Sequence, residues 1–141
     1  MARNTKKAPH ECATYLFLEF KDVDDVPADA ELRARLERAG RAISAFTEDY
    51  AIKKYGCEIA RNEQYDADVN NMVHRTIKDL VGKESEVKQM LEALDADLYL
   101  EIVPYIRADS DCPKPILSLD RDIIEFLYKS GTQLDIDYYI I

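Results

Sequence analysis

Carboxylate and tyrosine side chains at two places in the chain are the residues whose types and spacing could do chemistry. Asp135, Asp137 and Tyr139 alternate with apolar residues near the C-terminus, which places all three on one face of an expected strand. Glu101 and Tyr105 show the same alternation in an earlier segment and could share that face of a sheet. Clustered carboxylates can hold a metal ion or transfer protons, and tyrosines beside carboxylates suit contacts with a basic protein. These five residues are the candidate site, and we expect a partner-binding face.

Alternation of this kind has a second explanation. The side of a half-covered sheet that faces water also carries acidic and tyrosine residues, so the pattern alone does not separate a site from a wet surface. Another acidic group, Asp22, Asp24, Asp25 and Asp29, lacks the glycine and terminal glutamate of a calcium loop and is expected to cap a helix. No spacing in the chain matches a metal-ligand motif, so we expect no metal and no cofactor.

The chain lacks the motifs of the common enzyme classes. Its two histidines, His10 and His74, have no serine, cysteine or carboxylate at a recognisable catalytic spacing. The four glycines form neither a G-x-G-x-x-G nor a G-x-x-x-x-G-K pattern, which excludes a glycine-rich phosphate loop. We therefore predict no catalytic residues and favour a non-catalytic protein, although a site assembled from distant residues would escape this search.

The three cysteines, Cys12, Cys57 and Cys112, are odd in number and far apart in the chain. They indicate neither a disulfide framework nor a structural zinc site. Free thiols of this kind fit a reducing compartment.

Composition and charge set the class of protein. The 141 residues are 47% hydrophobic and 33% charged, as in one folded domain. The formal net charge of −9 repels phosphate backbones, so we expect no nucleic acid to be bound directly by the folded body. An acidic surface suits a basic protein partner, although solubility alone also explains it. No apolar run approaches the roughly 20 residues that cross a bilayer, so we expect no membrane contact and a cytoplasmic location.

Hydrophobic periodicity predicts the elements of the first half. Residues 1–11 are expected to form a flexible basic tail, and 12–141 a single domain. A strand over 13–20 precedes a long helix that begins after Pro27 and ends near Gly56. Gly40 could instead end a shorter helix and leave 41–47 as a strand, and the sequence does not decide between them. A short strand over 57–60 follows.

The second half shows a clearer pattern. An apolar stripe from Val69 stops at Gly82, and a second one continues to Leu94, which predicts a pair of helices. Pro104 falls inside the next strand, so that strand is expected at a sheet edge or bulged. This order of elements predicts an α+β fold with a mostly antiparallel sheet and helices packed on one face. The remaining elements are strands over 98–107, 116–119 and 133–141 and a helix that ends at Gly131.

Several features of the second half together resemble a known family. They are the helical stretch 69–94, the strand 98–106, Pro115-Ile-Leu-Ser-Leu, Ile123-Ile-Glu-Phe-Leu, and Gly131 followed by Leu-Asp-Ile-Asp-Tyr over 134–138. With these features, residues 69–141 resemble an uncharacterised bacterial domain family, the domain of unknown function 4279. The resemblance implies an α+β fold and a bacterial or phage origin, and it brings no activity and no catalytic residues. The first half departs from that family's pattern, in which a short helix leads to a proline-rich turn and a strand with a tryptophan, because this chain has no tryptophan.

Our leading hypothesis is a non-catalytic acidic protein-binding module, of the inhibitor or immunity-protein type, that binds a basic protein partner. It rests on a single domain, an acidic body and the lack of a catalytic motif. One alternative is a small metal- or ligand-dependent enzyme that uses the carboxylate cluster on the sheet face. Another is a structural subunit that forms a homodimer by strand pairing.

Overall fold

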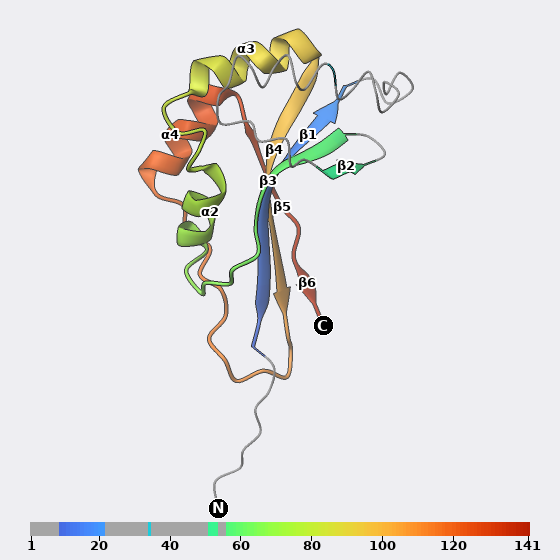
Figure 1. The fold of residues 1–141 in the computed structure, drawn as a ribbon. Helices are drawn as coiled ribbons and strands as arrows, with labels where there is room; N and C mark the ends of the chain where they lie inside the picture. The colour runs from blue at the N-terminus through green and yellow to red at the C-terminus, as the bar shows by residue number, and fades with distance from the viewer. Residues whose placement is uncertain (1–8, 22–33, 35–50, 54–55) are drawn as a thin grey trace, which may run out of the picture.

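A six-stranded sheet with helices on one face makes up the described part of the chain (Figure 1). The computed structural model describes residues 9–21, 34, 51–53 and 56–141. The predicted α+β fold with a mostly antiparallel sheet is confirmed. The strands are β1 (Glu11–Phe20), β2 (Ala51–Lys53), β3 (Gly56–Asn62), β4 (Ala96–Ile106), β5 (Gln133–Ile136) and β6 (Tyr139–Ile140), and the helices are α2 (Val69–Ile77), α3 (Glu84–Leu94) and α4 (Arg121–Ser130). The sheet has the order β2-β3-β1-β4-β5, and β6 continues beside β4 beyond the end of β5.

The long strands β1 and β4 form the centre of the sheet, and each buries every second residue against the helices. They pair in antiparallel register along their whole length, from Glu11 opposite Tyr105 to Phe20 opposite Ala96. Strand residues two apart point to the same face, so one face becomes apolar and packs while the other keeps the polar side chains. The residues of the sheet that pack on this side are Cys12, Leu16, Leu18, Phe20, Cys57, Ala96, Leu98, Leu100 and Ile102.

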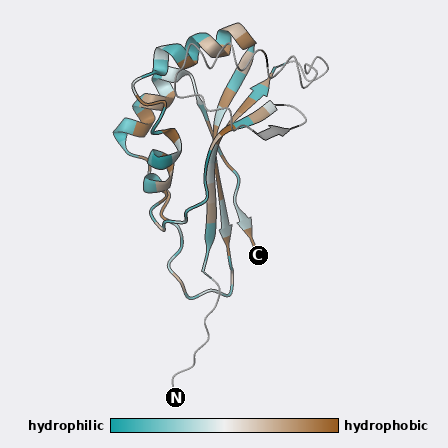
Figure 2. Cartoon of the chain, viewed as in Figure 1, coloured by the Kyte–Doolittle hydropathy of each residue, from teal (hydrophilic) through white to brown (hydrophobic). Residues whose placement is uncertain are grey.

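The three helices close this core with their apolar faces. Hydrophobic and hydrophilic residues alternate around them, as the changing colour along α3 and α4 shows (Figure 2). The predicted end of the last helix is confirmed, because Gly131 adopts the left-handed conformation (φ 73°) and its N–H bonds to the last turn of α4. Asp120 caps the start of that helix by accepting from the N–H of Ile123.

Strand β4 is an interior strand, so the prediction of a sheet edge at Pro104 is wrong. The proline instead interrupts the neighbouring strand. The N–H of Asp137 donates to the C=O of Ile102, and a continuous parallel ladder would next need an N–H from residue 104. Proline has none, so the expected single strand 133–141 is divided into β5 and β6 on either side of this gap.

Several element boundaries differ from those that periodicity predicted. The expected strand 116–119 is a single bridge between Asp68 and Ile116, which ties a loop to the start of α2. The expected helix end near Gly56 is wrong, because Ala51–Lys53 pairs with β3 as a strand. The rest of that helix, apart from the helical Ala34, lies outside the described residues, as does the choice between helix and strand for 41–47.

The predicted tail over 1–11 extends too far along the chain. His10 is 1% exposed, its Nε2 donates to the C=O of Cys112, and its Nδ1 accepts from the N–H of Arg107. These two bonds hold the start of β1 against the loop that follows β4. Residues 1–8 lie outside the described part.

Candidate functional site

The five predicted site residues lie together on the side of the sheet away from the helices. Glu101 of β4 is in register with Asp135 of β5, and Tyr105 of β4 is in register with Tyr139 of β6. The two tyrosine rings stack with their centroids 5.4 Å apart and an interplanar angle of 14°. The Tyr139 hydroxyl donates to Asp137 Oδ2 at 2.8 Å, which brings the fifth residue to the group. Parallel pairing of both short strands with β4 is what juxtaposes these residues.

Two further aromatic residues extend this group across β1. Tyr15 lies opposite Glu101, and Phe17 lies opposite Tyr99 of β4. These four side chains are half-buried. They point away from the helices, because the residues that alternate with them along β1 and β4 pack in the core. The candidate residues predicted from the sequence do not include Tyr15. We call the surface formed by Tyr15, Tyr99, Glu101, Tyr105, Asp135, Asp137 and Tyr139 the acidic tyrosine face.

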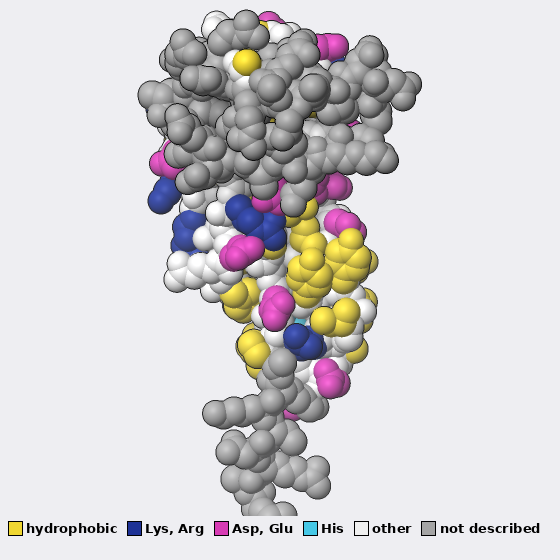
Figure 3. Space-filling model, turned by 45° about the vertical axis from the view of Figure 1, so that its right-hand side comes forward, with side chains coloured by type: hydrophobic (Ala, Val, Ile, Leu, Met, Phe, Trp, Pro, Cys, Tyr) yellow, Lys and Arg dark blue, Asp and Glu magenta, His cyan; other side chains and the backbone are white. Residues whose placement is uncertain are grey.

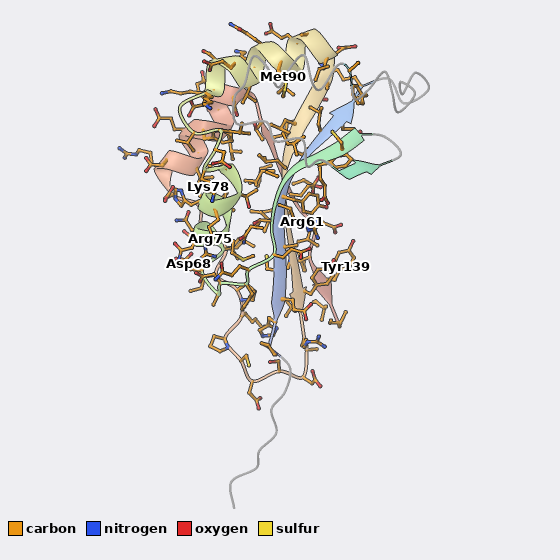
Figure 4. The ribbon with its side chains drawn as sticks, viewed as in Figure 1. Arg61, Asp68, Arg75, Lys78, Met90 and Tyr139 are labelled. Atoms are coloured by element: carbon orange, nitrogen blue, oxygen red, sulfur yellow. The ribbon has the colours of Figure 1, made fainter. Side chains whose placement is uncertain are left out.

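Arg61 of β3 lies at the border of the acidic tyrosine face, and its guanidinium is 5.0 Å from the centre of the Tyr15 ring. A bulge in the pairing of β1 with β3 places it there, because the register shifts after Leu16 and two residues three apart come to the same face. Arg61 therefore pairs with Glu58 at 2.7 Å and also with Glu63 at 2.7 Å. Figure 4 shows Arg61 and Tyr139 on the side of the sheet opposite Asp68 and Arg75.

The Glu101 carboxyl retains its proton to an unusually high pH. Partial burial raises the pKa of Glu101 to about 8, and the hydrogen bond and charge of Asp135 and the charges of Asp137 and Glu19 add to the effect. The protonated Glu101 carboxyl forms a hydrogen bond with the Asp135 carboxylate, whose negative charge disfavours a second charge at Glu101. The pair is the chemically most perturbed group on this face.

Three tyrosines of this face, Tyr15, Tyr99 and Tyr139, have raised pKa values, and the Tyr139 hydroxyl donates a hydrogen bond to Asp137. Burial raises the pKa of Tyr15 and Tyr99, and nearby carboxylates reinforce both shifts. The hydrogen bond to Asp137 raises the pKa of Tyr139. Figure 3 shows hydrophobic side chains, with which tyrosines are coloured, gathered on this side of the molecule with acidic side chains around them. Such a surface can receive a cation between carboxylates and aromatic rings.

Away from the acidic tyrosine face, the carboxylate of Asp120 contacts His74 of α2, a pairing that the sequence did not indicate. Asp120 Oδ2 is 2.6 Å from His74 Nε2 and also accepts from Asn70 at 3.0 Å. The other carboxylate oxygen caps α4, so Asp120 joins the starts of two helices. These hydrogen bonds lower the pKa of Asp120, with the bond to His74 as the largest cause. The arrangement serves to fix α4 on α2.

The cysteines contribute no reactive thiolate to this face. Burial raises the pKa of Cys12 to about 11 and of Cys57 to about 12, so both thiols stay neutral in the core. All three cysteines are free, and Cys112 is partly exposed in the loop after β4.

Within the described ranges, no three His, Cys, Asp or Glu side chains converge in an arrangement that could hold a metal ion. No helix in the same part of the chain is long and apolar enough to cross a bilayer.

Comparison with known proteins gives a family. Residues 34–141 match the family described as Domain of unknown function (DUF4279). The match begins well before residue 69, where the resemblance was expected to start, so it includes part of the half that we expected to depart from the family. No curated protein and no solved structure matches the chain. Because the match covers most of the sequence, the chain belongs to the DUF4279 family.

Proposed function

We propose that the chain is a non-catalytic protein-binding module, of the inhibitor or immunity-protein type, that receives a basic segment of a partner protein on the acidic tyrosine face. The observation that carries the proposal is the Glu101–Asp135 pair, in which a half-buried Glu101 lies among tyrosines beside the exposed Asp135, with Asp137 nearby. A lysine or arginine of a partner would neutralise the pair, and the proton that the pair now holds would leave. The acidic surface expected from the sequence, with its net charge of −9, favours encounter with a basic protein.

The aromatic residues around the carboxyl pair suit the same role. Tyrosine is enriched among the residues that dominate protein interfaces, because it offers a large rigid contact area and one hydroxyl. The stacked Tyr105 and Tyr139 provide a flat apolar platform beside the acids. The guanidinium of Arg61 lies over the Tyr15 ring, so one cation of the chain itself is already bound by an aromatic ring at this face.

The first test compares two variants with equal loss of charge. The triple variant Glu101→Gln, Asp135→Asn, Asp137→Asn changes the acidic tyrosine face. The control Asp79→Asn, Glu86→Gln, Glu92→Gln removes three exposed carboxylates on the helix side. We expect affinity capture from the native host to recover a basic protein with the natural chain and the control, and to lose it with the face variant. Equal recovery by both variants would place binding elsewhere.

The pH dependence of binding provides a sharper test with the captured protein once purified. Binding of a cation to the unprotonated pair competes with the proton, so affinity rises by up to tenfold per pH unit below about pH 8 and levels off above it. Calorimetry in two buffers of different ionisation enthalpy should register release of one proton at pH 7. Binding that does not change between pH 6 and 8 would contradict this role for the pair.

A second candidate function has one observation in its favour. A carboxyl with a pKa of about 8 could act as a general acid in a small ligand- or metal-dependent enzyme. This alternative predicts that a divalent cation or a small metabolite raises the melting temperature, and that Glu101→Gln abolishes the rise. Failure of every cation and metabolite tested, together with capture of a basic protein, would favour the binding module.

A further inference from the structure

The C-terminal edge of the sheet is open to pairing with another strand. In the described part of the chain, no strand pairs with β5 and β6 on the side away from β4. The N–H of Asp137 and both backbone groups of Ile141 point toward β4 and the loop after it. Successive residues of a strand direct their backbone N–H and C=O groups to opposite sides. The N–H and C=O groups of Ile136 and Ile140 therefore point to the free edge.

The side chains at this edge form an exposed apolar surface on the helix side of the sheet, separate from the acidic tyrosine face. Ile136 and Ile140 are in register with Ile102 and Ile106, whose side chains point to the helix side. A groove of about 330 Å³ lies beside them, lined by Pro104, Ile106, Pro115, Leu117, Ile136 and Tyr138. The exposed fractions at the edge are 43% for Leu134, 39% for Ile136, 61% for Tyr138 and 66% for Ile140.

The exposed apolar area at this edge is large for a monomer. With Leu117, the exposed parts of Leu134, Ile136, Tyr138 and Ile140 amount to roughly 500 Å², within the upper part of the range for the largest apolar patch on a typical monomer. A standard interface buries about 800 Å² per partner, which the strand backbone and a polar border would complete. Residues 133–141 contain no Lys, Arg or Pro, the residues that most effectively block pairing at a sheet edge.

We propose that two copies of the chain pair through the edge formed by residues 134–141, antiparallel about a two-fold axis at Tyr138. This geometry pairs Ile136 with Ile140 of the second copy, so both outward-facing residues form hydrogen bonds. It also sets Asp137 opposite Tyr139 of the second copy, so no two carboxylates meet across the axis. The same patch serves both copies, as a two-fold interface requires, and the apolar rows of the two sheets become continuous.

Salt distinguishes this dimer from binding of a basic partner. Each copy carries a net charge of −9, so the two repel and the apolar pairing should strengthen as salt screens the charge. Binding of a basic protein on the acidic tyrosine face should weaken over the same range. The dimer can therefore fail while the proposed function holds, and the reverse is also true.

Sedimentation equilibrium on the full chain tests the proposal. We expect a dimer at about 100 μM chain in about 0.5 M NaCl, and at least tenfold weaker association for Ile140→Lys or Ile136→Lys. Ile124→Lys should associate as the natural chain does, since Ile124 lies on α4 and its exposure of 56% is between those of Ile136 and Ile140. A monomer under these conditions, or a dimer that both edge variants leave unchanged, would overturn the proposal.

A cysteine at the axis tests the register directly. In a chain with Cys112→Ser, Tyr138→Cys should form a disulfide between position 138 of one copy and position 138 of the other. Residues directly opposite each other in a hydrogen-bonded strand pair lie about 5.5 Å apart between Cα atoms, within the range for a disulfide. Tyr128→Cys on α4, at 86% exposure, is the control for random collision. We expect rapid cross-linking at 138 alone, and equal slow cross-linking at both positions would overturn the two-fold pairing.

Discussion

Replacement of Glu101 by glutamine should make the protein more stable at pH 8 and leave it unchanged at pH 4. The folded chain holds the Glu101 proton to about pH 8, whereas an unfolded glutamate releases it near 4.5. Between these values, unfolding releases a proton, so the free energy of unfolding falls as the pH rises. The favourable contribution of the protonated carboxyl is complete below pH 4.5 and is lost as the pH rises through 8. Glutamine keeps the shape and the hydrogen bond to Asp135 without this loss.

The size of the effect follows from how far Glu101 is buried. Each unit of pKa difference between the folded and unfolded states corresponds to about 1.4 kcal/mol. Water screens a half-buried carboxyl, and reorganisation of Asp135 relieves part of the repulsion, so the full conversion is an upper limit. We expect Glu101→Gln to raise the free energy of unfolding by about 1–2 kcal/mol at pH 8, with most of the gain between pH 5 and 8.

Urea unfolding followed by far-ultraviolet circular dichroism, at several pH values from 4 to 9, measures this difference. Glu125→Gln is a matched control, because the Glu125–Lys129 pair on α4 lowers the pKa of Glu125. Its substitution should slightly destabilise the protein, with no change between pH 6 and 8. If Glu101→Gln is no more stable than the natural chain at pH 8, or if its gain is the same at pH 5 and 8, the reasoning about the carboxyl pair is refuted.

Two further substitutions test how the sheet is held together. Gly56→Ala should lower the free energy of unfolding by about 1–3 kcal/mol in urea titrations, because a Cβ there would lie 1.8 Å from the backbone oxygen of Leu18 and force β3 away from β1. Stability equal to that of the natural chain would show that the two strands can separate at no cost. His10→Ala should cost about 2–3 kcal/mol, since it leaves the N–H of Arg107 and the C=O of Cys112 without their buried partner. Hydrogen exchange at Arg107 should accelerate in that variant, and unchanged protection would contradict the assigned role.

Local sequence signals predicted the elements whose periodicity is strong and whose ends carry a capping residue. The alternation in 13–20 predicted β1, and the stripes after Val69 predicted α2 and α3. Gly131 marked the end of α4, because glycine accepts the left-handed conformation there at no steric cost. Alternation also predicted that Asp135 and Tyr139 face the same side. Each of these outcomes depends only on residues within one turn or one strand.

Short elements and sheet order escaped prediction. β2 has three residues and lies where a long helix was expected to end, and a segment of that length carries no periodic signal. Pro104 predicted a sheet edge or a bulge in its own strand, but that strand is interior and pairs without a bulge, and the interruption lies in its neighbour. Its own strand pairs fully with β1, and the missing N–H affects only the neighbour on the other side. Sequence alone does not say which neighbour a strand residue points toward.

The sequence by itself determined that Glu101, Tyr105, Asp135, Asp137 and Tyr139 alternate with apolar residues, and that the chain is acidic. Only the tertiary structure decided that β5 and β6 lie parallel beside β4, which puts Asp135 next to Glu101 and Tyr139 on Tyr105. It also decided that a bulge in β3 turns Arg61 to the same side as Tyr15. The physical reason is that alternation fixes the face of a side chain within one strand, whereas register and pairing between strands depend on contacts between distant parts of the chain.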